Sequence, residues 1–213
     1  MTLCEWAPKA LAEKLLTPEL CEVRVGSEFV VKETDDLNGG AAEVTLRFPK
    51  ALPSLLLHGA KTNTGFFSFI ENQKCADGAL LVDLGNKRYA GYLLECKLTL
   101  SPKSLAKIQQ QLIGAIYKLR AIVGLLEGRL EQVSLFAAFR CNRLNEARGA
   151  SPILHHGRVG RAVPDSSSDK CEVILPLPGE NQDAIPIRLV HLADGKDDTG
   201  YANVELALPP VSH

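Results

Sequence analysis

Glu95 and Lys97 are the two residues of this sequence whose types and spacing could do chemistry, since only Cys96 separates them. They belong to the run Gly91–Leu100, which is rich in residues that favour strands. Successive side chains of a strand point to opposite faces, so Glu95 and Lys97 share one face and Cys96 points to the other. Burying charge in a strand is costly unless the charges pair or hold a metal. We therefore expect this position to need both groups.

A second carboxylate is expected to join them. The runs 79–84 and 88–97 predict two antiparallel strands joined as a hairpin, and Asp77 precedes the first of them. In the register that we expect, Asp77 falls opposite Glu95. Cross-strand partners have Cα atoms roughly 4.5–5.5 Å apart and side chains on the same face. The sequence thus predicts that Asp77, Glu95 and Lys97 cluster.

The register depends on the turn. A three-residue turn over 85–87 pairs Leu84 with Arg88 and gives the arrangement above. Asp83 is the alternative acid, but in this register it lies about 20 Å along the strand from the glutamate. It could take the place of Asp77 only if the turn centred on Tyr89. That turn would put Gly85, Asn86 and Lys87 inside a strand, where they fit poorly, so Asp77 is favoured.

Two acids at hydrogen-bonding range repel each other unless a cation lies between them. Carboxylate oxygens are natural ligands of Mg²⁺, and Mn²⁺ is the expected substitute. A lysine beside such a metal can stabilise developing charge on a phosphate or orient a water molecule. Asp77 and Glu95 as metal ligands, with Lys97 as the assisting group, are therefore the parts needed to hydrolyse a phosphodiester bond.

The elements around the cluster complete an α/β pattern. Ser101-Pro102 is typical of a helix start, and an apolar stripe predicts a helix to about Leu126. The almost wholly apolar run 133–139 predicts a strand covered on both faces. Other expected elements are a helix over 7–16, strands over 22–32 and 42–48, a helix or short strand within 51–76, and strands over 173–177, 185–192 and 204–208.

Asp77, a short hairpin, Glu95-x-Lys97, a helix and an apolar strand together resemble the core of the PD-(D/E)XK nuclease superfamily. The resemblance covers roughly residues 75–140, with Ala76 at the position that is usually proline. It implies a restriction-endonuclease-like fold and metal-dependent nuclease activity. The family's exonuclease and CRISPR-associated branches often carry glutamine and tyrosine on the following helix, which makes Gln111 a candidate catalytic residue. Here Tyr117 follows at a different spacing from the usual one.

The superfamily also tends to place an acid on its first helix, and Glu13 is the nearest candidate. Arginines concentrate after the apolar strand, in a stretch that contains a single acid. Because arginine pairs well with phosphate oxygens, these residues are candidate nucleic-acid contacts. They are Arg140, Arg143, Arg148, Arg158 and Arg161.

The composition bounds the remaining choices. The chain has 213 residues, a formal net charge of −1 and 46% hydrophobic residues, values typical of a globular protein. Its six cysteines show no C-x-x-C spacing, and residues 1–6 lack a signal-peptide pattern, so we expect a reducing, cytoplasmic location. No apolar run is long enough to span a membrane. So neutral a chain would bind bare DNA weakly, which favours a protein partner or a homo-oligomer.

The sequence thus predicts an α/β fold: a restriction-endonuclease-like mixed β-sheet flanked by helices. We expect a nuclease domain over 1–163 and a β-rich C-terminal extension over 164–213, packed on the same domain. The expected activity is Mg²⁺-dependent hydrolysis of DNA, in preference to RNA, within a repair, restriction or anti-phage defence complex. The alternatives are a catalytically inactive nuclease-fold module that binds a partner, and a structural or regulatory domain in which Glu95 and Lys97 form only an ion pair.

Overall fold

A computed structural model describes residues 2–13, 15–16, 18–35, 40–58, 76–144, 172–175, 185–195 and 199–210. Within these residues the fold is a mixed α/β arrangement, in which nine strands form one sheet. The strands follow the order β6-β7-β5-β4-β3-β2-β9-β8, and β1 pairs with β2 outside this path. The mixed α/β class expected from the sequence is confirmed at this level.

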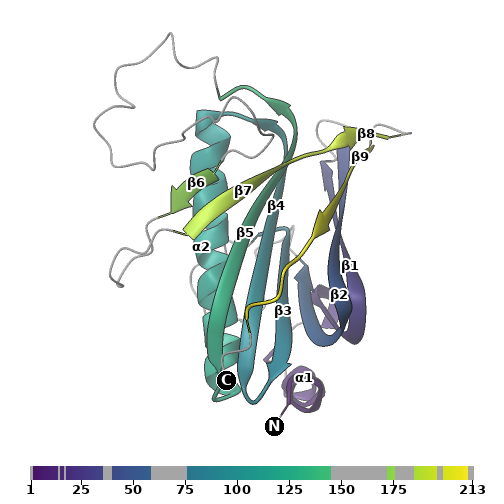
Figure 1. Ribbon diagram of the computed structural model, residues 1–213, viewed down its shortest axis with the longest axis vertical. Coiled ribbons are helices and arrows are strands. Elements are labelled where there is room, and N and C mark those ends of the chain that lie inside the picture. Colours follow the sequence, from purple (N-terminus) through teal and green to yellow (C-terminus); the bar gives the residue numbers. More distant parts are fainter. Residues whose placement is uncertain are drawn as a thin grey trace.

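Three neighbouring strands, β5, β4 and β3, lie at the centre of the sheet (Figure 1). β3 (Gly78–Gly85) and β4 (Arg88–Leu100) form an antiparallel hairpin, and β5 (Arg129–Asn142) runs parallel to β4. The connection between β4 and β5 is α2 (Pro102–Leu125). Ser101 and Ser104 form a capping box at its start, and Pro102 occupies its first turn, as the sequence predicts. A parallel pair joined by a crossover helix requires α2 to run antiparallel to β4.

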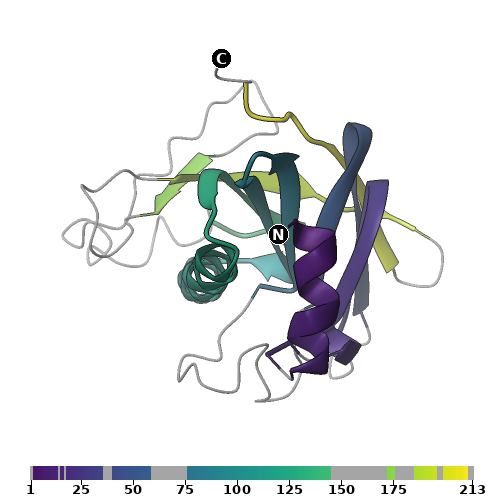
Figure 2. The same ribbon diagram turned by 90° about the horizontal axis from the view of Figure 1, so that it is seen from below.

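Two helices cover one face of this central sheet (Figure 2). α1 (Leu3–Ala12) begins with a capping box between Thr2 and Glu5 and packs mainly on β2 (Gly40–His58) and β1 (Cys21–Asp35). α2 packs on β4, β5 and β3. The two helices and the strands share one apolar core, which includes Trp6, Leu93 and Leu119. The face of β4 that carries its odd-numbered residues therefore points toward the helices.

The opposite face of β3 and β4 packs against a second layer of strands. This layer contains β1 (Cys21–Asp35), β2 (Gly40–His58) and β9 (Thr199–Glu205), with β9 parallel to the first part of β2. A second apolar core fills the space between the layers and includes Phe29, Val44, Tyr92 and Val204. The sheet thus turns back on itself, which encloses the even-numbered side chains of β4.

The C-terminal strands join both sides of this sheet. β7 (Ile185–His191) lies parallel to β5, and β6 (Glu172–Leu175) lies antiparallel to β7. β8 (Ala193–Asp194) pairs with β9. The Leu192 amide, between β7 and β8, donates to the Phe139 carbonyl of β5 at 2.8 Å. The segment from β7 to β9 therefore crosses from β5 to the second layer, and Leu192 packs in the second core. The predicted domain boundary at residue 163 lies outside the described residues.

Several bounds differ from the expectations. The first helix spans Leu3–Ala12, not 7–16, because Thr2 caps it and Pro8 is accommodated inside it. The run 42–48 is part of a longer strand, which continues to His58, while most of the ambiguous region up to residue 75 lies outside the described residues. A 3-10 turn, Pro18–Leu20, precedes β1.

The predicted hairpin turn is also one residue too long. Asn86 and Lys87 both have positive φ, at 55° and 58°, which closes a two-residue turn with Gly85 opposite Arg88. An irregularity between Asp83 and Gly85 absorbs the extra residue, so the pairs from Gly78 to Asp83 keep the predicted register.

No helix in the described part of the chain combines the length and the apolar character needed to cross a membrane.

Candidate functional site

Asp77, Glu95 and Lys97 come together at one end of the β3–β4 hairpin. The Asp77 amide donates to Glu95 Oε2 at 3.2 Å, and Lys97 Nζ donates to Glu95 Oε1. Lys97 Nζ also donates to the Cys96 carbonyl oxygen at 2.9 Å, and the Cys96 amide donates to Asp77 Oδ2 at 2.7 Å. Hydrogen bonds therefore link the two acids, the lysine and the main chain between them into one network, which we call the carboxylate–lysine cluster.

The sheet geometry explains why these side chains meet. Gly78 pairs with Leu94, so Asp77 stands next to Glu95 just before β3 begins. Gly78 is needed there because Val31 of β1 packs against it: an added Cβ would lie 2.4 Å from a Val31 methyl carbon. The close contact between Val31 and Gly78 holds the start of β3 against β1 and thereby fixes the position of Asp77.

The three side chains of the cluster differ in their exposure to solvent. Glu95 is 0% exposed, whereas Asp77 is half-buried and the Lys97 side chain is 23% exposed. Cys96, between them, points into the second core and is buried, as the strand alternation predicts. A carboxylate without solvent contact therefore lies directly behind two polar groups that solvent reaches.

Burial and neighbouring charge shift the ionisation of both partners. Burial, and then repulsion from Asp77, raise the pKa of Glu95 to about 8, although Lys97 acts in the opposite direction. Burial lowers the pKa of Lys97, but attraction from Glu95 and Asp77 outweighs it, so this pKa is raised. The two acids thus compete for one positive charge, and the lysine ammonium supplies it.

Asp83, the alternative acid, lies at the other end of the hairpin and faces Tyr89. Its carboxylate accepts hydrogen bonds from the Leu3 amide at 3.3 Å and from the Gly85 amide at 2.8 Å. It therefore connects the start of α1 to the hairpin turn. The structure places Asp77, not Asp83, beside Glu95.

Gln111 lies on the sheet-facing side of α2, between Ile108 and Ala115 of the apolar core. Leu119 of α2 lies directly over Gly91 of β4, because a Cβ added to Gly91 would be 2.8 Å from the Leu119 Cδ1. From Leu119 back to Gln111 the helix rises about 12 Å, and from Gly91 to Glu95 the strand rises about 13 Å. These rises predict that Gln111 lies near the level of Glu95 on the same face of the sheet. Gln111 is half-buried, and its side-chain oxygen is shielded from solvent. Tyr117 is 39% exposed.

The arginine candidates divide into three groups. Arg140 forms an ion pair with Asp194 at 2.8 Å, which ties β5 to β8. Arg143 is exposed, and its amide donates to the Leu100 carbonyl at 2.7 Å, near the end of the sheet that carries Lys97. The other three, Arg148, Arg158 and Arg161, lie outside the described residues.

Glu33 of β1 is a further acid that sequence reasoning missed. It is half-buried, and its charge contributes, after burial and the charges of Asp77 and Glu95, to the raised pKa of the Cys96 thiol. The alternation of β1 could have indicated it, because Glu33 follows Phe29 and Val31 on the face that packs on the second core. Glu13, the candidate named from the sequence, is exposed at the C-terminal end of α1.

The donor set is compatible with a hard divalent cation. Asp77, Glu95 and the Cys96 carbonyl bring oxygen atoms into one network, and oxygen is what Mg²⁺ prefers. A cation there would also relieve the repulsion that raises the Glu95 pKa. Among the described residues, no three side chains of the His, Cys, Asp or Glu type gather as a metal site by themselves. Any ion would thus depend on two carboxylates and on main-chain or solvent oxygens.

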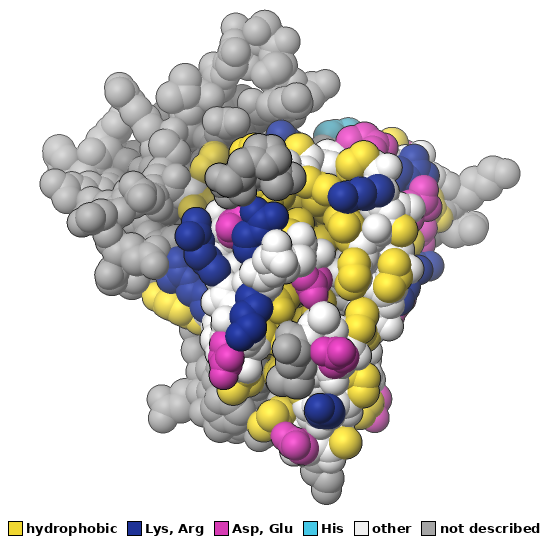
Figure 3. Space-filling model, turned by 60° about the horizontal axis from the view of Figure 1, so that its bottom comes forward, with side chains coloured by type: hydrophobic (Ala, Val, Ile, Leu, Met, Phe, Trp, Pro, Cys, Tyr) yellow, Lys and Arg dark blue, Asp and Glu magenta, His cyan; other side chains and the backbone are white. Residues whose placement is uncertain are grey.

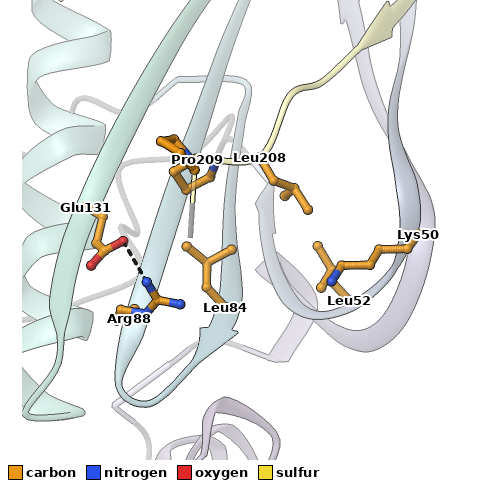
Figure 4. Close-up of a pocket in the computed structure, with 8 residues that line it drawn as sticks. Lys50, Leu52, Leu84, Arg88, Glu131, Leu208 and Pro209 are labelled. Carbon is orange, nitrogen blue, oxygen red and sulfur yellow. Dashed lines mark ion pairs between the residues drawn. The ribbon is translucent and has the colours of Figure 1, made fainter. Parts of the chain in front are cut away.

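A small cavity of about 70 Å³ lies at the turn end of the hairpin (Figure 4). Its walls are mostly apolar, and an ion pair between Arg88 and Glu131, 3.6 Å apart, closes one side. The residues lining it are Lys50, Leu52, Leu84, Arg88, Glu131, Leu208, Pro209 and Pro210. The cavity does not include any member of the carboxylate–lysine cluster.

Comparison with known proteins gives no relative: no family model matches the chain, and neither a curated protein nor a solved structure matches it significantly. The function has to be argued from the geometry of the chain itself.

Proposed function

We propose that this protein is a metal-dependent nuclease that hydrolyses phosphodiester bonds, with the carboxylate–lysine cluster as its active site. The observation that carries the proposal is the convergence of Asp77, Glu95 and Lys97, in which a fully buried carboxylate lies beside two groups that solvent reaches. A buried acid held beside a second acid is costly to maintain for structure alone. Perturbed ionisable groups of this kind are typical of catalytic sites.

Each residue has a distinct role in the proposal. Asp77 and Glu95 would hold Mg²⁺ or Mn²⁺, which when bound polarises the phosphate and activates water. Lys97, partly exposed, presents its ammonium to the same space, where it can orient the attacking water or stabilise charge that develops on the phosphate. Gln111, at the level of Glu95 on α2, would support the site from the helix side.

The order of the elements supports this assignment. Asp77 precedes a hairpin, the glutamate and lysine lie on its second strand, and α2 and the parallel strand β5 follow. This is the order on which the resemblance to the PD-(D/E)XK superfamily rests, and a restriction-endonuclease-like core is the fold that we propose for residues 75–140.

The proposed substrate is DNA in preference to RNA. Arg143, whose amide donates to the Leu100 carbonyl at the cluster end of the sheet, is the arginine that we propose to contact a phosphate. The net charge of −1 gives little attraction to a polyanion, so a protein partner or a second copy of the chain is expected to supply charge. A cytoplasmic repair, restriction or anti-phage defence complex is a suitable setting.

A second candidate function is a catalytically inactive nuclease-fold module that assembles with a partner protein. One observation favours it: Lys97 bonds directly to Glu95, so the pair can also act as a structural ion pair. The two candidates make opposite predictions about cleavage.

Nicking of supercoiled plasmid in the presence of Mg²⁺ separates them. The wild-type chain, alone or with its natural partners, is expected to nick DNA, and Lys97→Ala to lower the rate by about 100-fold or more while circular dichroism stays unchanged. Lys87→Ala is the matched control, because Lys87 pairs with Glu127 at the other end of the hairpin. If neither DNA nor RNA is cleaved under any of these conditions, the inactive-module function replaces the nuclease.

A further inference from the structure

The Lys97 ammonium contacts two of the oxygen atoms that the proposed metal would use. Its Nζ donates to Glu95 Oε1 and, at 2.9 Å, to the Cys96 carbonyl oxygen. Asp77 is held next to them by the Cys96 amide at 2.7 Å. A positive charge therefore already occupies the space in front of these oxygen donors.

We propose that Lys97 is the resting counter-ion of the site, and that a divalent cation must displace it from Glu95 and the Cys96 carbonyl in order to bind. This inference rests on the proposed function. Lys97 would then have two positions: on the carboxylate when no metal is present, and turned toward solvent and substrate when a metal is bound. The 23% exposure of its side chain leaves a path outward, while the fully buried Glu95 cannot follow it.

Two physical arguments support the displacement. The ammonium and a metal ion would compete for the same oxygen atoms, since Lys97 Nζ donates to both Glu95 Oε1 and the Cys96 carbonyl. Two positive charges a few ångströms apart in a partly buried site also repel each other strongly. The lysine that assists the proposed reaction would thus weaken metal binding. It would also neutralise the acids when the metal is absent.

The test measures metal binding without any nucleic acid. Isothermal titration with Mg²⁺ at pH 8.5, above the Glu95 pKa of about 8, compares the wild-type chain with Lys97→Met and Lys87→Met. We expect Lys97→Met to bind Mg²⁺ about tenfold more tightly than wild type, and Lys87→Met to bind like wild type. Asp77→Asn should abolish Mg²⁺ binding both in the otherwise wild-type chain and in the chain that also carries Lys97→Met.

The outcomes separate this inference from the proposed function. If wild type binds Mg²⁺ through Asp77 but Lys97→Met binds equally or more weakly, the counter-ion role is wrong and the metal site stands. If neither wild type nor Lys97→Met binds Mg²⁺, the metal site is wrong and the counter-ion role falls with it.

A measurement on the wild-type chain covers the case in which Lys97→Met does not fold. Acylation of each lysine by an amine-directed reagent is followed by mass spectrometry with and without Mg²⁺. Lys97 is expected to react several-fold faster when Mg²⁺ is present, because its amine leaves two hydrogen-bond acceptors, while exposed Lys103 is expected to react equally fast in both conditions. An unchanged or slower reaction of Lys97 would overturn the inference.

Discussion

The two ends of the β3–β4 hairpin each hold an enclosed acid, but the two acids have different partners. The Asp83 side chain accepts hydrogen bonds from the main-chain amides of Leu3 and Gly85, and the residue is 9% exposed. Glu95, 0% exposed, faces a second carboxylate and an ammonium. Amide donors satisfy a carboxylate without adding charge, whereas a neighbouring acid raises the cost of its ionised form. The comparison shows that burial alone does not distinguish the two acids, and that their partners do.

The same two ends also carry contrasting lysine–glutamate pairs. Lys97 and Glu95 lie 23% and 0% exposed, whereas Lys87 and Glu127, 2.9 Å apart, lie 50% and 81% exposed. Figure 3, in which the bottom of Figure 1 is turned forward, shows lysine and arginine side chains interspersed with acids. Water screens an exposed pair, so it contributes little to stability, while a buried charge without its partner is strongly unfavourable.

The largest effect expected from this comparison is a pH dependence of stability that comes from Glu95. Its pKa rises from 4.5 to about 8 on folding, so its contribution is fully present below pH 4.5 and is lost as the pH rises through 8. Metal-free wild type should therefore lose roughly 3–5 kcal/mol of unfolding free energy across this window. Glu95→Gln should remove most of that loss.

Urea unfolding in EDTA at a series of pH values measures how the unfolding free energy of wild type and of Glu95→Gln depends on pH. Equal slopes against pH in wild type and Glu95→Gln would show that the two ends of the hairpin do not differ in the way described.

A smaller effect is expected at the other end. Asp83→Asn removes the charge that accepts the Leu3 and Gly85 amides, and it should cost about 1–2 kcal/mol of unfolding free energy. Because Asp83 is not part of the cluster, plasmid nicking at a temperature where the variant is folded should match wild type. A loss of nicking by a folded Asp83→Asn protein would argue that Asp83, not Asp77, is the first acid.

The smallest effect is expected for the exposed pair. Lys87→Met should leave the urea midpoint and the nicking rate unchanged, since the Lys87–Glu127 pair is open to solvent. Lys97→Met provides the contrast, because it leaves Glu95 buried without its ammonium. Equal urea midpoints for the two variants would mean that the buried Lys97–Glu95 pair contributes no more to stability than the exposed Lys87–Glu127 pair does.

The local parts of the site could be predicted from the sequence because they depend on strand periodicity. Alternation put Glu95 and Lys97 on one face, and the hairpin register from Gly78 to Asp83 follows from where the turn residues lie. The turn itself was one residue too long in the prediction, since positive φ at both Asn86 and Lys87 was not anticipated.

The parts that depend on distant packing could not be predicted. Glu33 reaches the back of the site only because β1 folds over β3, where Val31 meets Gly78. Likewise, nothing near Arg140 in the sequence indicates its ion pair with Asp194, which forms only when β8 crosses to the end of β5. Contacts between segments far apart in the chain depend on the layer arrangement, and strand and helix periodicity do not encode it.

The proposed metal site is tested most directly by a crystal structure of the wild-type chain grown with Mn²⁺, in which anomalous scattering locates the metal. We expect an anomalous peak bound by the carboxylates of Asp77 and Glu95, with the Lys97 ammonium moved away from Glu95. A structure at saturating Mn²⁺ that shows no peak there, and Lys97 still bonded to Glu95, would contradict it.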